Sequence, residues 1–440
     1  MTNCLESSRN MRTYSLLSGL LVMGLAVAEA VEAAEGTKPA HFRVRSDVES
    51  GCYDVGGKAI VEVGIEEEGR RPEGPVEAWV DDGWTNVIWK RTVDMTEEPT
   101  FKMELTRTTP GSLRIHLKAK GMAERLDRLI FGVNDIKPLT PCPDDFEAYW
   151  KGERERLERN VPIAVEKTSA PHLNTADYDA FYVSVATFDN GRIYGMLTIP
   201  KGDGVFPVCV TVPGAGPGSI APWSLMARKG WVSITMNIQG FPIGRTMDEQ
   251  KARHKAWLDG LVKKSGEKTY QRFGFAMGRN LPIYHNSILG MVRMLDWLAK
   301  EPYTDAERFV YFGGSQGGGY GLYLTSMWGR FAKSVVYFPN MCDMMAYREG
   351  RQPGSEHIMD QTDEHRPAAE LTGPYYDACN FARLIRTPIR IMHGLSDDNC
   401  HTVGGIAAFN SIPSKDKKLL LIPGLGHRWI KTEFEQWLFE

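Results

Sequence analysis

A serine in a glycine-rich turn is the residue in this 440-residue chain best placed to act as a nucleophile. Ser315 lies within Gly313-Gly314-Ser315-Gln316-Gly317, a G-x-S-x-G sequence that directly follows the apolar run Phe309-Val310-Tyr311-Phe312. The residues after it, Gly318-Gly319-Tyr320, are expected to begin a helix. A sharp strand-to-helix turn presents a serine hydroxyl outward, and glycines leave the room that such a turn needs. A glycine-rich packing or phosphate-binding turn is the alternative.

A serine hydroxyl is a weak nucleophile unless a base takes its proton and a carboxylate orients that base. His427 follows the last apolar run of the chain and is the candidate base, with His393 and His401 as alternatives. Asp397 and Asp398 are adjacent candidates for the acid. The order serine, carboxylate, histidine along the chain is the order found in α/β-hydrolases.

Hydrolysis through a serine also needs N–H groups to stabilise the negatively charged oxygen of the intermediate. The backbone N–H of Gln316, directly after the serine, is the expected first donor. The second is expected from the glycine-rich segment Pro213–Gly218, where we favour Ala215 over Gly214. A plain flexible turn is the alternative for this segment. No step of this chemistry requires a metal or a cofactor.

The predicted elements bring these residues together. Strands and helices alternate from about residue 141 to residue 440, which indicates an eight-stranded α/β sheet of the α/β-hydrolase type. The first two strands are expected to form a hairpin, and a long insertion occupies residues 241–286. The eight expected strands are 181–187, 193–199, 205–212, 231–236, 309–312, 334–338, 388–392 and 418–422. Ser315, Asp397 and His427 follow the carboxyl ends of three of them.

The residues before this region show a different pattern. Short alternating runs separated by turn signals predict a small N-terminal β-sandwich of the immunoglobulin-like type over residues 36–137. Three prolines at 138, 141 and 143 mark a linker, and the catalytic domain is expected over residues 141–440.

The first 30 residues have the features of a cleaved signal peptide. Arg9 and Arg12 precede an apolar run from Leu16 to Val27, and small residues follow around Ala30. A single membrane anchor is the alternative, but the run is short for a span. We therefore expect a secreted or periplasmic protein with no stable membrane insertion after cleavage.

The overall composition excludes other classes. Lys and Arg total 52 against 55 Asp and Glu, a net charge of −3, so no nucleic-acid partner is expected. The cysteines show neither a C-x-x-C spacing nor a paired histidine, so no zinc site is predicted. Nothing in the sequence predicts the oligomeric state.

The site motifs resemble those of the acetyl xylan esterase and cephalosporin-C deacetylase family, a carbohydrate-esterase group of α/β-hydrolases. The resemblance covers residues 141–440 and rests on four segments. They are Asp145-Phe146 through Tyr149-Trp150, Gly313–Gly319, Pro339-Asn340-Met341-Cys342-Asp343 and Gly394-Leu395-Ser396-Asp397-Asp398-Asn399-Cys400. The last segment is similar to the family's Gly-Leu-x-Asp-x-x-Cys acid loop, which implies that Asp397 is the acid.

This resemblance implies an ester hydrolase that removes acetyl or similar small acyl groups from a small-molecule or polysaccharide ester. Pro213-Gly214-Ala215 stands where the family has His-Gly-Tyr, Asn237-Ile238-Gln239 where it has Arg-Gly-Gln, and His401-Thr402 where it has Pro-Pro after the acid-loop Cys. The alternatives to an acetyl ester hydrolase are a peptidase or an esterase for bulkier aryl acyl groups.

A non-catalytic glycan-binding protein is the alternative from another class. Its sugar platform would consist of Trp79, Trp84 and Trp89 in the N-terminal region. Alternation at positions 79 and 89 instead predicts two core tryptophans.

Overall fold

A computed structural model describes residues 41–65, 73–267, 269–354 and 364–440. The expected signal peptide, residues 1–30, lies outside the described residues. The chain divides into two compact units. Of the described residues, the first unit contains those up to Asp135 together with Gly394–Ser396 and Leu420–Gly426, and the second contains the others.

The first unit is built from two β-sheets. One has the strand order β1-β3-β6 and the other β2-β8-β7-β4-β5. The strands are β1 (Phe42–Ser46), β2 (Cys52–Tyr53), β3 (Lys58–Ile65), β4 (Val76–Asp81), β5 (Val87–Val93), β6 (Thr100–Thr106), β7 (Gly111–Lys118) and β8 (Arg125–Phe131). Alternate residues of both sheets enter a single buried apolar cluster. Two sheets therefore share one core, while the immunoglobulin-like assignment stays a prediction.

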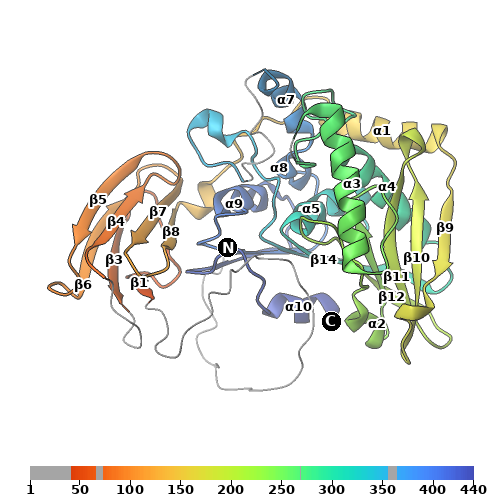
Figure 1. Ribbon diagram of the computed structural model, residues 1–440, viewed down its shortest axis with the longest axis horizontal. Helices are drawn as coiled ribbons and strands as arrows, with labels where there is room; N and C mark the ends of the chain where they lie inside the picture. The colour runs from red at the N-terminus through yellow and green to blue at the C-terminus, as the bar shows by residue number, and fades with distance from the viewer. Residues whose placement is uncertain (1–40, 66–72, 268, 355–363) are drawn as a thin grey trace. The chain divides into compact units, whose positions relative to one another are not determined.

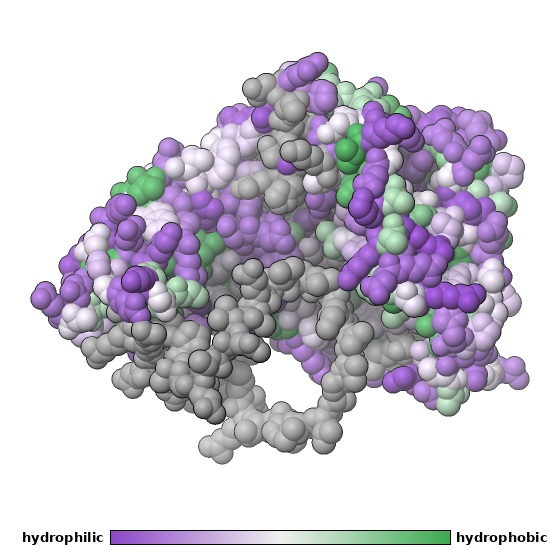
Figure 2. All heavy atoms as spheres, in the orientation of Figure 1, coloured by the Kyte–Doolittle hydropathy of each residue, from purple (hydrophilic) through white to green (hydrophobic). Residues whose placement is uncertain are grey.

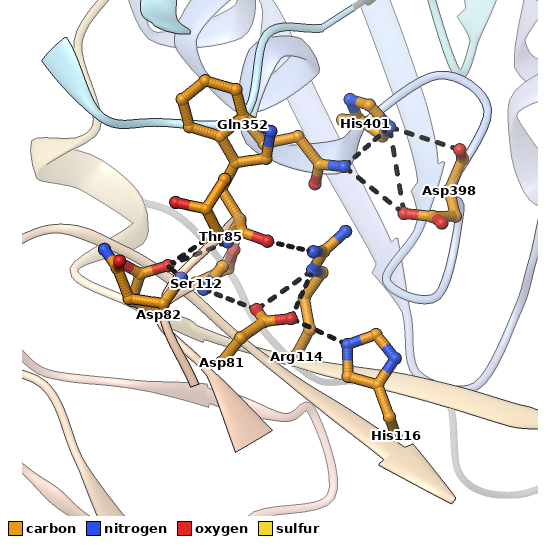
Figure 3. Close-up of polar contacts among 12 residues, drawn as sticks. Asp81, Asp82, Thr85, Ser112, Arg114, His116, Gln352, Asp398 and His401 are labelled. Atoms are coloured by element: carbon orange, nitrogen blue, oxygen red, sulfur yellow. Dashed lines mark hydrogen bonds and ion pairs between the residues drawn. The ribbon is translucent and has the colours of Figure 1, made fainter. Parts of the chain in front are cut away.

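The face of β4 and β7 that points away from this core carries polar and aromatic side chains. The Trp79 and His116 rings stack with centroids 4.7 Å apart, and Asp81 accepts from Arg114 at 3.0 Å and contacts His116 at 2.8 Å (Figure 3). The prediction of two core tryptophans is therefore wrong for Trp79. Its neighbours in β4, Ala78 and Val80, enter the core, and Trp79 points to the opposite face of the sheet. Trp89 does pack against the core.

The described residues also form a sheet of nine strands, not the eight expected, most of which belongs to the second unit. Its order is β17-β16-β15-β14-β12-β13-β11-β10-β9. The strands are β9 (Val165–Ser169), β10 (Tyr178–Ala186), β11 (Arg192–Pro200), β12 (Phe206–Thr211), β13 (Val232–Asn237), β14 (Thr304–Gly314), β15 (Lys333–Tyr337), β16 (Ile389–Gly394) and β17 (Lys417–Ile422). The additional strand is β9, an edge strand. Its four residues after Val165 are exposed, so it has no apolar pattern by which the sequence could be read as a strand.

The centre of this sheet is parallel and buried on both faces. Strands β13, β12, β14, β15 and β16 pair in parallel, and β13 and β16 are buried along their whole length. Strands β10 and β11 form the expected antiparallel hairpin. A mixed sheet with a parallel centre places the carboxyl ends of β12, β14 and β16 at the same edge.

Helices cover both faces of the sheet. The α-helices of this unit are α1 (Phe146–Asn160), α2 (Ser224–Arg228), α3 (Met247–Ser265), α4 (Ile283–Leu298), α5 (Gln316–Trp328), α7 (Arg366–Thr372), α8 (Ala378–Ala382), α9 (Thr402–Ser411) and α10 (Glu433–Phe439). Short 3₁₀ helices occupy Val133–Asp135, Pro171–Leu173, Phe188–Asn190, Ala346–Glu349 and Gly373–Tyr375. Figure 1 shows α5, α8 and α9 on one side of β14 and α2 and α10 on the other.

The insertion 241–286 is dominated by α3. Thr246 caps the helix by accepting from the N–H of Glu249, and Gly266 ends it in the left-handed conformation. Only Gln250 and Leu261 of the helix are buried, and Figure 2 shows the face of α3 turned to the viewer as mainly hydrophilic. The last residues of the insertion already belong to α4. Among the described residues, no helix combines the length and the apolar character that a membrane span requires.

Candidate active site

Ser315 lies at a sharp turn between β14 and α5. Its φ of 58° and ψ of −123° are a conformation that residues with a side chain rarely adopt. The glycine two residues later makes the turn possible, because a Cβ on Gly317 would lie 2.0 Å from the carbonyl oxygen of Val212. The backbone therefore crowds the end of β12 and holds the serine at the carboxyl edge of the sheet.

The structure brings the three predicted side chains into one hydrogen-bonded chain. His427 Nε2 lies 3.1 Å from Ser315 Oγ. On the other side of the ring, Nδ1 lies 2.9 Å from Asp397 Oδ2 and 3.1 Å from Oδ1. Both distances are within hydrogen-bond range. The carboxylate fixes Nδ1 as the protonated nitrogen, which leaves Nε2 to accept the serine proton.

Asp397 is fully buried and its ionised form is well supported. Its Oδ1 accepts the backbone N–H groups of Asn399 and Cys400, both at 2.9 Å. Burial opposes ionisation, but the hydrogen bond with His427, the nearby His393 and these backbone donors outweigh it, so the pKa of Asp397 lies below its usual value. The carboxylate therefore carries its charge throughout the physiological pH range.

The alternative acid and one alternative base are engaged elsewhere. Asp398 is exposed, and its side chain lies near Gln352 Nε2 at 3.5 Å and His401 Nε2 at 3.8 Å (Figure 3). His401 also contacts the carbonyl oxygen of Pro353 through Nδ1 and Gln352 Nε2 at 2.9 Å through Nε2. Of the three candidate histidines, His427 is the one whose ring lies within hydrogen-bond distance of Ser315.

The two predicted N–H donors belong to separate segments of the chain. Gln316 is the first residue of α5, and an N–H in the first turn has no acceptor within the helix. Ala215 lies in the loop after β12 and is exposed. This loop is held from the end of β13, where Gln239 Nε2 donates to the carbonyl of Gly216 at 2.6 Å and Asn237 exchanges two hydrogen bonds with Ser219 at 2.9 Å.

Two further side chains, to which the sequence analysis assigned no role, border the serine and the histidine. Cys400 Sγ lies 3.8 Å from Ser315 Oγ, and burial raises the pKa of its thiol well above the usual value. The Phe338 ring meets the His427 ring edge-on, with centroids 4.7 Å apart. Cys400 belongs to the acid-loop motif, so a signal for it existed. Phe338 follows a buried strand and resembles any other core aromatic.

This geometry supplies a nucleophile, a base and an orienting acid within hydrogen-bond distance of one another. That set suits acyl transfer, because the hydroxyl gains nucleophilicity as its proton passes to the imidazole. In the described parts of the chain, no three His, Cys, Asp or Glu side chains are arranged to hold a metal ion.

Comparison with known proteins assigns the chain to a family. The sequence profile described as acetyl xylan esterase (AXE1) matches residues 127–439. The chain belongs to the acetyl xylan esterase family. It is therefore a carboxylic ester hydrolase, and the alternative of a non-catalytic glycan-binding protein is wrong.

Individual relatives agree with this assignment. The chain is 29% identical over 331 residues to the acetyl esterase Axe7A of Xylanibacter ruminicola, covering 74% of this chain and 73% of that one. Among solved structures, acetyl xylan esterase 1 of Thermoanaerobacterium sp. superposes with a TM-score of 0.58 at 20% identity. The acetyl xylan esterase of Paenibacillus sp. R4 does so with 0.56 at 21%. Both matches cover 70% of this chain and 96% of the other, and both show the α/β-hydrolase fold.

Proposed function

We propose that this chain is an exported serine esterase that removes acetyl groups from carbohydrate esters through Ser315, His427 and Asp397. The hydrogen-bonded chain from Ser315 Oγ through the His427 ring to Asp397 is the observation that supports the proposal most. Membership of the acetyl xylan esterase family supports the acetyl group and the carbohydrate.

The reaction runs in two halves. Ser315 Oγ attacks the ester carbonyl carbon while His427 Nε2 takes the hydroxyl proton, and the Asp397 carboxylate stabilises the imidazolium that forms. The N–H groups of Gln316 and Ala215 bind the oxygen that becomes negative. The intermediate then collapses, the C–O bond to the alcohol breaks, and His427 gives its proton to that alcohol. Water attacks the acyl-serine in the same way and releases the acid.

The names of the relatives indicate which class of alcohol leaves in the reaction. The solved structures bear the name acetyl xylan esterase and the curated relative is an acetyl esterase, which supports a sugar hydroxyl of a polysaccharide or of a fragment of one. We extend the proposal to the organisation of the chain. Residues 1–30 act as a cleaved signal peptide that delivers a secreted or periplasmic enzyme, residues 36–137 form an immunoglobulin-like sandwich, and residues 141–440 carry the catalysis.

Acetate release by purified wild type and Ser315→Ala tests the proposal. The substrates are acetylated xylan and 4-nitrophenyl acetate, and circular dichroism verifies that the variant folds. We expect release from both substrates by wild type and loss of release in the variant. Release from 4-nitrophenyl acetate alone would agree with the serine-esterase mechanism and would reject a polysaccharide as the substrate. Activity confined to peptides or to esters with bulkier aryl acyl groups would reject the acetyl assignment. Equal activity in Ser315→Ala would reject Ser315 as the nucleophile.

A further inference from the structure

A tyrosine from the insertion 241–286 reaches the two segments that carry the proposed N–H donors. The Tyr270 hydroxyl donates to Gln316 Oε1 at 2.8 Å and accepts the backbone N–H of Gly216 at 3.2 Å. Gln316 Nε2 in turn lies 3.4 Å from the carbonyl oxygen of Gly214. One phenol therefore links the residue after the serine to the loop that contains Ala215.

This phenol is firmly fixed. Tyr270 is 6% exposed, and its ring packs against Trp257 and His254 of α3, with centroids 5.6 and 5.9 Å away. Burial raises the pKa of Tyr270 to about 12, so the hydroxyl keeps its proton at neutral pH and donates it to Gln316. A fixed, protonated donor holds its acceptor in one place.

The contact with Gly216 also determines which N–H groups of the loop are free for substrate. Gly216 has a φ of 138°, a conformation that favours glycine. Its N–H is occupied by Tyr270 and its carbonyl by Gln239. Gly216 is thereby removed as an oxyanion donor, and Ala215 and Gly214 stay the two candidates proposed for this loop.

The insertion holds the same loop at a second point. Gln250 of α3 is fully buried, and its Nε2 donates to the carbonyl of Pro217 at 2.6 Å. Its Oε1 accepts the N–H of Gly244 at 2.8 Å. The loop itself, Pro213-Gly214-Ala215, lacks the large side chain that the resemblance would place in it. The insertion therefore adds two hydrogen bonds to those that residues at the end of β13 make with this glycine-rich segment.

We propose that Tyr270 is a positioning residue that aligns the N–H groups of Gln316 and the Pro213–Gly218 loop for the oxyanion. This inference rests on the proposed function, because it concerns the same reaction. Without the hydroxyl, Gln316 Oε1 loses the hydrogen bond that it accepts from Tyr270. The loop loses the hydrogen bond at Gly216, next to Ala215. Both changes misplace donors that act mainly in the transition state, so they lower kcat more than they raise KM.

Tyr270→Phe removes the hydroxyl and keeps the ring. We expect kcat for 4-nitrophenyl acetate to fall about 10–100-fold, with KM changed less than about threefold. Methylboronic acid, which forms a tetrahedral anionic adduct with an active serine, should bind more weakly by a similar factor. The matched control is Tyr323→Phe, which removes a buried hydroxyl bonded to the backbone carbonyl of Tyr376. It should lower thermal stability and leave kcat and boronate affinity unchanged.

A kcat for Tyr270→Phe within twofold of wild type, or a loss equalled by Tyr323→Phe, would overturn the proposal. If Tyr270→Phe does not fold, 3,5-difluorotyrosine incorporated at position 270 replaces it. This residue keeps the hydroxyl but loses its proton at lower pH, so kcat should decline at lower pH than in wild type, and an unchanged profile would overturn the proposal. Failure of the proposed function is distinguishable, because it would appear as equal turnover by wild type and Ser315→Ala.

Discussion

At the residue scale, Asp397 and Asp398 show how neighbouring carboxylates acquire different environments. Asp397 is buried and shares its oxygens between His427 and two backbone N–H groups. Asp398 is exposed and near Gln352. The two residues are adjacent in the chain, so the difference arises from how the loop after β16 turns.

The two aspartates provide a matched pair of variants. Asp397→Asn should lower kcat about 10²–10⁴-fold, because an amide can hold His427 in the tautomer that cannot accept the serine proton. Asp398→Asn should leave kcat within about twofold of wild type. Steady-state kinetics on 4-nitrophenyl acetate measures both, with thermal melting as the check on folding. Equal losses in the two variants would mean that the loop, not the contact with His427, is responsible.

Much of the site could be predicted at this scale because the motifs are local. Ser315 is recognisable from the glycines around it, and His427 from its position after the last strand. Tyr270 could not be predicted, since it lies 46 residues from Gln316 in a segment with no motif, and only the folded chain brings its hydroxyl to that side chain.

At the element scale, the turn between β14 and α5 depends on close backbone packing. The first turn of α5 lies so near the end of β12 that a Cβ on Gly317 would overlap the carbonyl oxygen of Val212. The overlap is with backbone, which cannot rotate away as a side chain can. The position of the serine is therefore coupled to the packing of α5 on the sheet.

Gly317→Ala should destabilise the protein by about 3 kcal/mol or more, the range of severe steric changes. The control is Gly152→Ala in α1, where an added Cβ meets no other atom within 4 Å. That change should stabilise by about 0.5–1 kcal/mol, because alanine favours a helix interior. Urea unfolding of both variants measures the difference. A Gly317→Ala protein as stable as wild type would contradict the packing described for the turn.

The strands of the nine-stranded sheet differ in how clearly burial marks them in the sequence. The eight expected strands correspond to β10–β17, several of them continuous apolar runs covered on both faces. The ninth, β9, is held by backbone pairing with β10. Backbone hydrogen bonds do not depend on side-chain type, so an exposed edge strand leaves little trace in the sequence.

At the scale of the whole molecule, one carboxylate links two helices of the second unit. Glu153 of α1 contacts His285 of α4 at 2.8 Å and pairs with Arg156 at 2.6 Å. Burial opposes ionisation, but the contacts with His285 and Arg156 outweigh it and lower the pKa of Glu153 to about 2. The pairing therefore favours the folded state whenever Glu153 is ionised.

The pH dependence of stability follows from this shift. The pKa of Glu153 is lowered from 4.5 to about 2 in the folded protein. Its contribution to the free energy of unfolding is therefore complete above pH 4.5 and is lost as pH falls from 4.5 toward 2. After allowance for solvent screening, we expect it to amount to about 1–2 kcal/mol. Glu153→Gln should lose this amount at neutral pH and approach wild type near pH 2.

Urea unfolding from pH 7 to pH 2 measures the convergence of the two curves. Glu155→Gln is the control, because Glu155 pairs with Arg159 on the exposed side of the same helix. It should follow wild type at every pH. Parallel curves for Glu153→Gln and wild type would show that Glu153 titrates normally in the folded protein.

The position of the acyl group during turnover shows which residue is the nucleophile. Wild-type enzyme mixed with 4-nitrophenyl acetate is quenched in acid within the first turnovers, digested and mapped by mass spectrometry. We predict an acetyl group on Ser315 in the wild type and none in Ser315→Ala. Wild-type turnover with the acetyl group on another residue, or unchanged turnover by Ser315→Ala, would contradict the assignment of Ser315 as the nucleophile.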